Sequence, residues 1–372
     1  MADMPLARFA CTGCAACCRQ DWRIPLTADE AARVDDWYRG SAAWQGDDGG
    51  WQLKRAGGEC ALLMADRRCG IHQEQGAAAK PLACRLYPFS FLRTPDGPVT
   101  MLALDCPGVT WPAAADAETT AAAQQLAAAG DPPELAAVRW QRHPVAWAVY
   151  RGWREWLRRE STGSIRPRDL LLAAARSAAA LPGLSAWHDP DAEQRLDWLV
   201  PVAGEEQPLV RRRLLALALL LTQPADGTPP TAALRAWLRP GAVWSLGAAG
   251  EHPVTVLELV AEQSTADGDA VLRWYLAELL RRHLPARADG ELDAGLRVMT
   301  LVARLTLLLA AAQASRCGTA RIDAAAMRAA VMLVDRRFAL HLRLDGAGLF
   351  AGTARAMGER LLHDPNYYAS LL

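Results

Sequence analysis

The sequence has no excess of charge of either sign, and this absence removes one broad class of function. Lys+Arg and Asp+Glu number 41 each, so the formal net charge is zero. Nearly all of the positive charge is arginine, because the chain contains only two lysines, Lys54 and Lys80. Proteins that bind nucleic acid generically carry a basic surplus, so we expect no nucleic-acid partner.

The sequence also lacks a signal-like N-terminus and a long apolar run. The first eight residues, Met-Ala-Asp-Met-Pro-Leu-Ala-Arg, contain no basic stretch followed by an apolar segment. The apolar run at 214–221 is much shorter than the about 20 residues that span a bilayer. We therefore expect a cytoplasmic protein with no membrane partner. In that reducing compartment, clustered cysteines indicate metal ligands or catalytic groups more often than disulfides.

Cysteine is distributed very unevenly along the chain. Eight of the nine cysteines lie between Cys11 and Cys106, and Cys317 stands alone. A chain of 372 residues exceeds a typical domain of about 100–200 residues. We predict a cysteine-cluster metal-binding domain over 1–110, a connector over 111–133 that is rich in alanine, and an all-α domain over 134–372.

Helical periodicity supports the all-α assignment. Apolar side chains recur three and four residues apart in two segments, one at Trp147, Tyr150, Trp153 and Leu157, the other at Val271, Leu272, Tyr275, Leu276 and Leu279. The pattern predicts two long helices over 296–312 and 324–342, joined by a turn that contains Gly318. Near the N-terminus, Thr27 and Glu30 predict a capping box that starts a helix reaching to about Arg39. The expected fold is mainly α, with a small irregular cysteine-rich metal-binding module packed on an all-α helical domain.

The first four cysteines form a Cys-x2-Cys-x2-Cys-Cys array at Cys11, Cys14, Cys17 and Cys18. Two residues between cysteines allow both thiolates to face one ion, as in zinc ribbons and iron–sulfur proteins. Gly13 and the small residues after Cys14 let the backbone curl around a metal. The array therefore predicts metal binding.

The remaining cysteines of this region lie far apart in the sequence and can fold back onto the array. All eight are candidate metal ligands: Cys11, Cys14, Cys17, Cys18, Cys60, Cys69, Cys84 and Cys106. A tetrahedral zinc or a [4Fe–4S] cluster takes four ligands, so the count allows two sites, or one site plus cysteines with another role. Cys17 and Cys18 are adjacent and are candidates for different sites. We do not expect Cys317 or His72 to be ligands.

Ordered motifs through this region resemble a known family. Beyond the Cys11–Cys18 array, they are Gly58-Glu-Cys60, Cys69-Gly-Ile and Lys80-Pro-Leu-Ala-Cys84-Arg85-Leu-Tyr87-Pro-Phe. The chain resembles the YkgJ-type cysteine-cluster family, which is described as zinc- or iron-chelating. One branch is the flagellin lysine-N-methylases, and Trp22 after the array resembles that branch. The resemblance implies zinc or a [4Fe–4S] cluster and, for the methylase branch, S-adenosylmethionine and a protein or peptide substrate.

The usual signatures of S-adenosylmethionine enzymes are missing. No glycine-rich loop follows a predicted strand, as a Rossmann-type methyltransferase requires. Cys14 and Cys18 have the first spacing of the radical-enzyme motif, but Asp21 stands where its third cysteine belongs. An open metal site could still act on a small molecule, with Asp21, Tyr87 and Asp105 as acid–base groups.

Two hypotheses follow, and they assign different roles to the metal. In the first, the protein is a metal-dependent lysine N-methyltransferase or a similar protein-modifying enzyme, in which Arg85 and Tyr87 contact the cofactor. Its substrate groove would be lined by Trp140, Trp147, Trp153 and Trp156. In the second, the protein stores, senses or delivers zinc or iron through a closed four-thiolate site and performs no catalysis.

Overall fold

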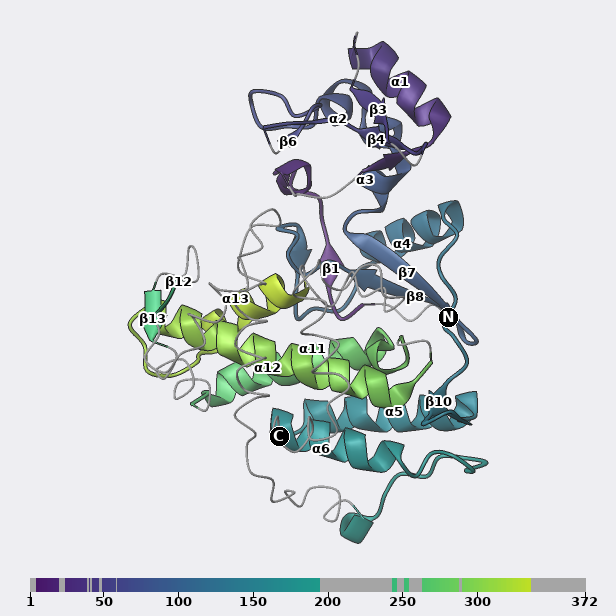
Figure 1. Cartoon of the computed structure of the whole chain (residues 1–372), viewed down its shortest axis with the longest axis vertical. Coiled ribbons are helices and arrows are strands. Elements are labelled where there is room, and N and C mark those ends of the chain that lie inside the picture. The colour runs from purple at the N-terminus through teal and green to yellow at the C-terminus, as the bar shows by residue number, and fades with distance from the viewer. Residues whose placement is uncertain are drawn as a thin grey trace. The chain divides into compact units, whose positions relative to one another are not determined.

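Helices provide most of the regular structure in this chain, and its strands are short (Figure 1). The computed structural model describes residues 5–19, 24–38, 40, 42–46, 49–57, 59–194, 243–245, 251–253, 263–287 and 290–335. The chain divides into two compact units, Met1–Pro133 and Glu134–Leu372. At this coarse level the prediction of a mainly helical protein is confirmed, while the packing of one domain on the other stays a prediction.

The N-terminal unit is built from short helices and two- or three-stranded sheets. Its elements are β1 (Arg8–Phe9), η1 (Ala16–Arg19), β2 (Pro25–Leu26), α1 (Ala28–Tyr38), β3 (Ala43–Gln45), β4 (Trp51–Leu53), β5 (Arg55–Ala56), β6 (Glu59–Cys60), α2 (Gly70–Gln75), η2 (Ala77–Ala79), α3 (Leu82–Leu86), β7 (Phe89–Thr94), β8 (Gly97–Leu102), β9 (Val109–Thr110) and α4 (Ala117–Ala129). Antiparallel pairing joins β2, β4 and β3 in that order, and also β5 with β6, β7 with β8, and β1 with β9.

Helix α1 begins at the predicted capping box. The backbone N–H of Glu30 donates to Oγ1 of Thr27 at 3.1 Å, and the backbone N–H of Thr27 donates to Oε2 of Glu30 at 3.0 Å. The other carboxylate oxygen of Glu30, Oε1, accepts from the backbone N–H of Leu82 at 2.7 Å. Because Leu82 opens α3, this one buried carboxylate fixes the start of two helices, and α3 carries Cys84.

The segment expected to be a connector contains a helix of its own. Helix α4 starts at Asp116, whose side chain accepts from the backbone N–H of Thr119 at 2.8 Å. The helix contacts β1 and β7 within the N-terminal unit (Figure 1). Oγ1 of Thr119 also accepts from the backbone N–H of Phe9 at 2.9 Å, which ties the helix to β1. Residues 111–133 are therefore part of the N-terminal unit's packing.

The C-terminal unit is a set of packed helices with two small hairpins. Its described elements are β10 (Arg139–Trp140), β11 (His143–Pro144), α5 (Trp147–Thr162), α6 (Pro167–Ala178), β12 (Val243–Ser245), β13 (Glu251–Pro253), α11 (Ala266–Arg281), η4 (Leu284–Ala286), α12 (Leu292–Arg316) and α13 (Ala324–Val334). Helix α11 packs on α5, α6, α12 and α13, and α12 packs on α6 and α13. The predicted apolar face of α11 is buried, and on α5 only Trp147 is left partly exposed.

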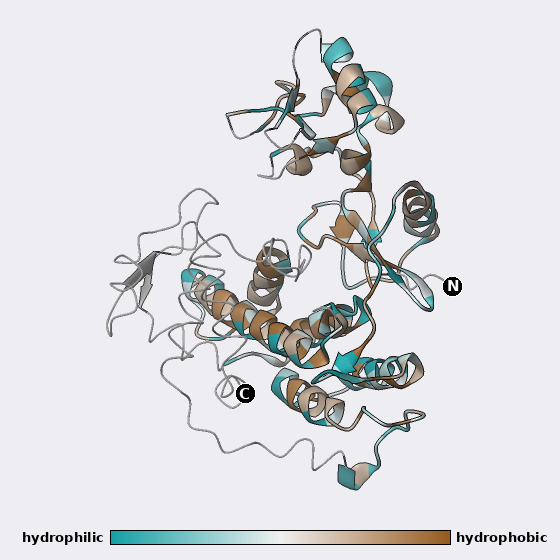
Figure 2. Cartoon of the chain, turned by 45° about the vertical axis from the view of Figure 1, so that its right-hand side comes forward, coloured by the Kyte–Doolittle hydropathy of each residue, from teal (hydrophilic) through white to brown (hydrophobic). Residues whose placement is uncertain are grey.

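Helix α12 is the long central helix of this unit, and it contains the expected helix at 296–312. Of the helices in the described ranges, it alone is long and apolar enough to cross a membrane (Figure 2). However, 72 % of its most apolar 18-residue window is buried inside the structure. Its apolar length is thus accounted for by packing against α13, α6 and η4.

A network of charged side chains lies buried between α11 and α13. Oε1 of Glu278 accepts from Nη2 of Arg281 at 2.7 Å and from Nε of Arg282 at 2.8 Å. Nη1 of Arg282 also donates to Oδ1 of Asp335 at 2.6 Å. Burial alone would raise the pKa of Glu278, but the adjacent guanidinium groups hold it at about 2. The charges are paired, as buried charges must be.

Candidate metal centre

The eight clustered cysteines come from six places in the N-terminal unit. Cys11 and Cys14 lie between β1 and η1, Cys17 and Cys18 lie in η1, and Cys60 ends β6; Cys69 immediately precedes α2, Cys84 lies within α3, and Cys106 lies in the turn between β8 and β9. None of the eight forms a disulfide. The fold therefore brings into one unit cysteines as far apart in sequence as Cys11 and Cys106, which are 95 positions apart.

Five of these cysteines share one core cluster. Cys18 and Cys60 are among its buried members, and Cys17, Cys69 and Cys84 are partly buried and pack against it. Strand β6, which carries Cys60, contacts η1, and the residue Leu63 that follows β6 forms a β-bridge with Cys69. Cys11, Cys14 and Cys106 are not members of this cluster.

The sulfur of Cys18 is hydrogen-bonded to three other sulfurs of the cluster. The thiol of Cys18 is hydrogen-bonded, as donor, to the sulfurs of Cys17, Cys60 and Cys69. This hydrogen bond is the main reason that the pKa of Cys17 and that of Cys69 are lowered to about 6, and the charge of Lys80 lowers both further. It also lowers the pKa of Cys60, while the pKa of Cys18 is raised because its proton is shared among three sulfurs. We call these four residues the four-thiol set.

The donor chemistry of the four-thiol set suits zinc or iron. The pKa values of three of the four thiols, Cys17, Cys60 and Cys69, are lowered, which favours the thiolate form that binds these metals. Among the residues that the structure describes, however, no three His, Cys, Asp or Glu side chains already stand in a metal-holding geometry. The thiols instead bond to one another, so a metal ion would replace their shared protons.

Cys84 is a fifth thiol beside the four-thiol set. Burial is the main reason that its pKa is raised to about 12, and the charges of Cys60 and Cys69 raise it as well. Lys80 opposes this rise, as it stands near several of these sulfurs. Cys84 thus favours the neutral thiol while Cys17 and Cys69 favour the thiolate.

Cys106 lies in a different environment, next to two oxygen-bearing side chains. The thiol of Cys106 and the hydroxyl of Tyr87 are hydrogen-bonded, and that hydroxyl also donates to Oδ1 of Asp105 at 3.5 Å. Burial raises the pKa of Cys106 to about 11, and the charges of Cys14 and Asp105 act in the same direction. The pKa of Tyr87 is raised as well, chiefly by burial. This second group therefore combines thiols with a hydroxyl and a carboxylate.

Comparison with known proteins matches the same stretch of chain. Residues 10–113 match the family model CxxCxxCC, whose description reads "Putative zinc- or iron-chelating domain". Residues 10–113 are thus similar to the CxxCxxCC family. The match covers every clustered cysteine and confirms the family that the motifs predict. The methylase branch within it stays a prediction.

One curated relative is similar to part of this chain. "Uncharacterized protein MJ0939" of Methanocaldococcus jannaschii is 32 % identical over 103 residues, which are 27 % of this chain and 37 % of that protein. The similarity thus spans little more than a third of the relative's length. No solved structure matches the chain.

Arg85 and His72, two polar residues that the sequence analysis discussed, both lie within residues 10–113. Arg85 is half-buried, and its Nε is buried without a hydrogen-bond partner within the described residues. His72 is half-buried, and its charge lowers the pKa of Cys69. Asp21 lies outside the described residues, as does Trp22. The metal and cofactor roles assigned to the cysteines, Arg85 and Tyr87 stay predictions.

Sequence reasoning missed the role of Lys80. Its charge lowers the pKa of Cys17 and of Cys69, and at Cys84 it opposes the larger rise in pKa that burial causes. The signal was present, because Lys80 is one of only two lysines and lies in the motif that leads to Cys84. A cation near several thiolates offsets part of their mutual repulsion.

Two of the four tryptophans that would line a substrate groove under the first hypothesis lie instead in the core, as an aromatic stripe at helical spacing usually does. Trp153 and Trp156 are 0 % and 3 % exposed and belong to the core of the helical unit. Nε1 of Trp153 donates to Oγ of Ser177 at 2.7 Å, which satisfies its polar atom inside that core. Trp153 and Trp156, aromatic residues at helical spacing, thus pack inside the helical unit.

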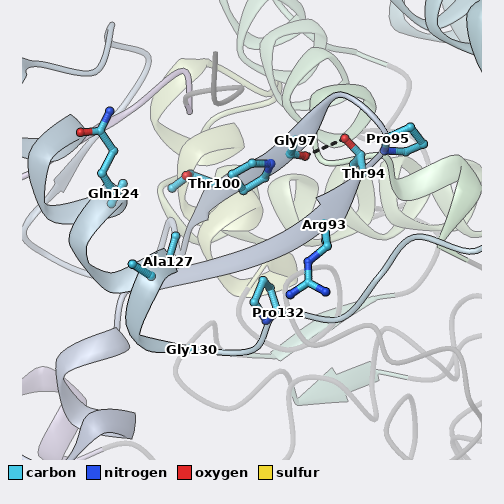
Figure 3. A pocket seen from close by; sticks show the side chains of 12 residues that line it. Arg93, Thr94, Pro95, Gly97, Thr100, Gln124, Ala127, Gly130 and Pro132 are labelled. Atoms are coloured by element: carbon cyan, nitrogen blue, oxygen red, sulfur yellow. Dashed lines mark hydrogen bonds between the residues drawn. The ribbon is translucent and has the colours of Figure 1, made fainter.

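A groove of about 580 Å³ lies elsewhere in the N-terminal unit, between the β7–β8 hairpin and α4 (Figure 3). Thr100 and Gln124 line it, and Arg93 stands at its edge and pairs with Asp131 at 2.9 Å. No cysteine lines this groove. It is therefore separate from both groups of thiols.

Proposed function

We propose that the CxxCxxCC domain binds zinc or iron through the four-thiol set, Cys17, Cys18, Cys60 and Cys69. The observation that carries this proposal is the hydrogen bonding of the Cys18 thiol to the sulfurs of Cys17, Cys60 and Cys69, all within one core cluster. Four thiolates complete a zinc site or ligate a [4Fe–4S] cluster. The family description supports zinc or iron chelation.

The metal and its ligands can be tested together by anaerobic purification of the full chain. We expect either about one zinc or about four iron and four sulfide per chain for this site. Cys69→Ser, at a half-buried position, should remove that metal, whereas Cys317→Ser should retain it, because Cys317 is exposed in the other unit. A Cys69→Ser protein with full metal content would contradict the proposal. A brown wild-type protein would favour the [4Fe–4S] cluster, and a colourless protein with zinc alone would exclude it.

We further propose that the metal domain serves a protein-modifying enzyme, lysine N-methylation with S-adenosylmethionine being the specific form. Two observations support a cofactor site beside Cys84. The buried Nε of Arg85 has no partner within the described residues, and an anionic group such as the cofactor's carboxylate would satisfy it. Tyr87 and Asp105 place an acid–base pair next to Cys106. Non-catalytic storage, sensing or delivery of metal is the alternative.

Methyl transfer is tested with S-adenosylmethionine that carries a labelled methyl group. Incubated with the metal-loaded full chain and a lysine-rich protein such as flagellin, it should leave label on lysine. Arg85→Ala should weaken binding of the cofactor, measured by calorimetry, whereas Arg93→Ala, at a half-exposed arginine in the separate groove, should not. If the metal-loaded wild type neither binds the cofactor nor transfers label, the storage, sensing or delivery alternative is favoured.

A further inference from the structure

The groove between the β7–β8 hairpin and α4 exists because one of its walls carries only small side chains. Ala123, Ala127 and Ala128 of α4 line it opposite the hairpin (Figure 3). Alanine is too short to fill the space between a helix and a sheet, and about 580 Å³ is left open. Protein interiors are otherwise close-packed, and cavities of about 300–1,000 Å³ with a mostly apolar lining are typical of small-molecule sites.

The lining of this groove is aliphatic. Thr100 and Ala123, which are 2 % and 1 % exposed, form its bottom, and Pro95, Pro98 and Pro132 contribute to its rim. Among the described residues that line the groove, none is aromatic. It therefore lacks the stacking surface on which nucleobases and proline-rich peptides bind. An aliphatic ligand matches this lining better.

The rim also offers few main-chain donors to an extended peptide. Pro95, Pro98 and Pro132 have no backbone N–H. The backbone N–H of Arg93 already donates to the carbonyl of Pro133 at 2.8 Å. Peptides that lie along a strand are held chiefly by main-chain hydrogen bonds. The groove thus favours a small molecule over a peptide.

The charge of the groove selects the head group of the ligand. Arg93 alone is charged among the residues that line it, all of which the structure describes. Its Nη2 pairs with Asp131, but the two side chains are 50 % and 94 % exposed, and an ion pair this exposed is weak. The other guanidinium N–H groups of Arg93 make no hydrogen bond within the described residues. They can bind a carboxylate in a bidentate manner.

A single negative charge fits this arrangement better than two. A phosphate dianion would find one cation in the lining and would be repelled by the nearby carboxylate of Asp131. A monocarboxylate is balanced by Arg93 alone. Its hydrocarbon part would cover the apolar lining, which gains free energy in proportion to the area removed from water.

We propose that this groove binds an aliphatic monocarboxylate, with the hydrocarbon chain against the alanines of α4 and the carboxylate on Arg93. The site contains no cysteine. It goes beyond the proposed metal-binding function and does not depend on it.

Octanoate is a suitable probe, and octan-1-ol is its uncharged counterpart. In the full chain, labelled with ¹³C at alanine methyl groups, octanoate should shift the NMR signals of Ala123, Ala127 and Ala128. Arg93→Ala should weaken octanoate binding about tenfold or more, because a charge-assisted hydrogen bond is lost, but should leave octan-1-ol binding unchanged. Asp131→Asn should bind octanoate at least as tightly as the wild type, since a competing carboxylate is removed.

Filling the groove tests the position of the hydrocarbon chain. Ala127→Leu adds a bulky side chain at a half-buried lining position and should abolish binding of both probes. Gln125→Leu is the matched control, because Gln125 is exposed on the same helix and does not line the groove. It should bind both probes as the wild type does. Leucine is a good helix former, so both variants should keep the helix, as circular dichroism would verify.

Three results would overturn the proposal. The first is no shift of the alanine methyl signals at octanoate concentrations up to about 10 mM, well above the dissociation constant of about 1 mM expected for a ligand of this size. The second is equal octanoate affinity in the wild type and Arg93→Ala, which would remove the carboxylate contact. The third is an equal effect of Ala127→Leu and Gln125→Leu, which would place the ligand outside the groove. Every variant leaves the cysteines intact, so these results are independent of metal binding.

Discussion

His283 is a residue whose protonation state follows from its neighbours. Nη1 of Arg154 can only donate, so Nε2 of His283 must accept, and Nδ1 then carries the proton and donates to the hydroxyl of Tyr150 at 3.2 Å. The ring is 1 % exposed and stacks on Trp147 at a centroid distance of 5.6 Å. Burial, and then the charge of Arg154, lowers the pKa of His283 to about 2. The folded protein therefore holds a neutral histidine.

This shift predicts acid sensitivity of the helical unit. Between pH 6.5, the ordinary pKa of a histidine, and about 2, the unfolded chain binds a proton at position 283 that the folded chain does not. Stability therefore rises with pH in this window and is lost as the pH falls, by about 1.4 kcal/mol for each unit below 6.5. Urea unfolding between pH 7 and pH 5 should show the loss. His283→Gln should flatten the dependence, although the variant is less stable at pH 7, while the exposed His188→Gln should not. If the unfolding free energy changed with pH equally in the wild type and in His283→Gln, the acid sensitivity would not come from His283.

At the scale of single elements, the sequence predicts those structures whose causes are local. Helix α1 begins at the expected capping box because the two side chains that cap it are three residues apart. The long helices α12 and α13 lie where the apolar spacing predicts them. In the turn between them, Gly318 has a positive φ of +71°, a conformation that favours glycine. The predicted end of the last helix at 342 lies outside the described residues.

The grouping of the thiols depends on contacts that no local pattern contains. Cys60 contacts Cys18 because β6 contacts η1, and the segments that carry Cys11 and Cys106 come together through the pairing of β1 with β9, about 100 positions apart. Strands this short show no measurable alternation of apolar and polar residues, so their partners cannot be read from the sequence. The motifs could therefore identify eight candidate ligands but not their division. Helix α4 was missed for a related reason, since alanine dominates it and it has little amphipathic character.

At the scale of the whole chain, two units with different sources of stability share one polypeptide. The helical unit buries long apolar helices and a paired charge network. The N-terminal unit has short helices and strands, and its core cluster includes five cysteines. Small domains with limited cores commonly depend on metals for stability. We therefore expect metal to stabilise the N-terminal unit and not the helical one.

Calorimetry of the full chain, with and without a chelator, tests this division. Two unfolding transitions are expected. Removal of metal by prolonged anaerobic treatment with EDTA should lower the midpoint temperature of one transition by more than about 10 °C, or abolish that transition. The reason is that structural thiolate sites contribute several kcal/mol to folding. Cys69→Ser should reproduce the chelator's effect without chelator. His283→Gln should lower the other transition, which assigns it to the helical unit. If chelation moved both transitions equally, the two units would not be independent, because metal bound by one would then be stabilising the core of the other.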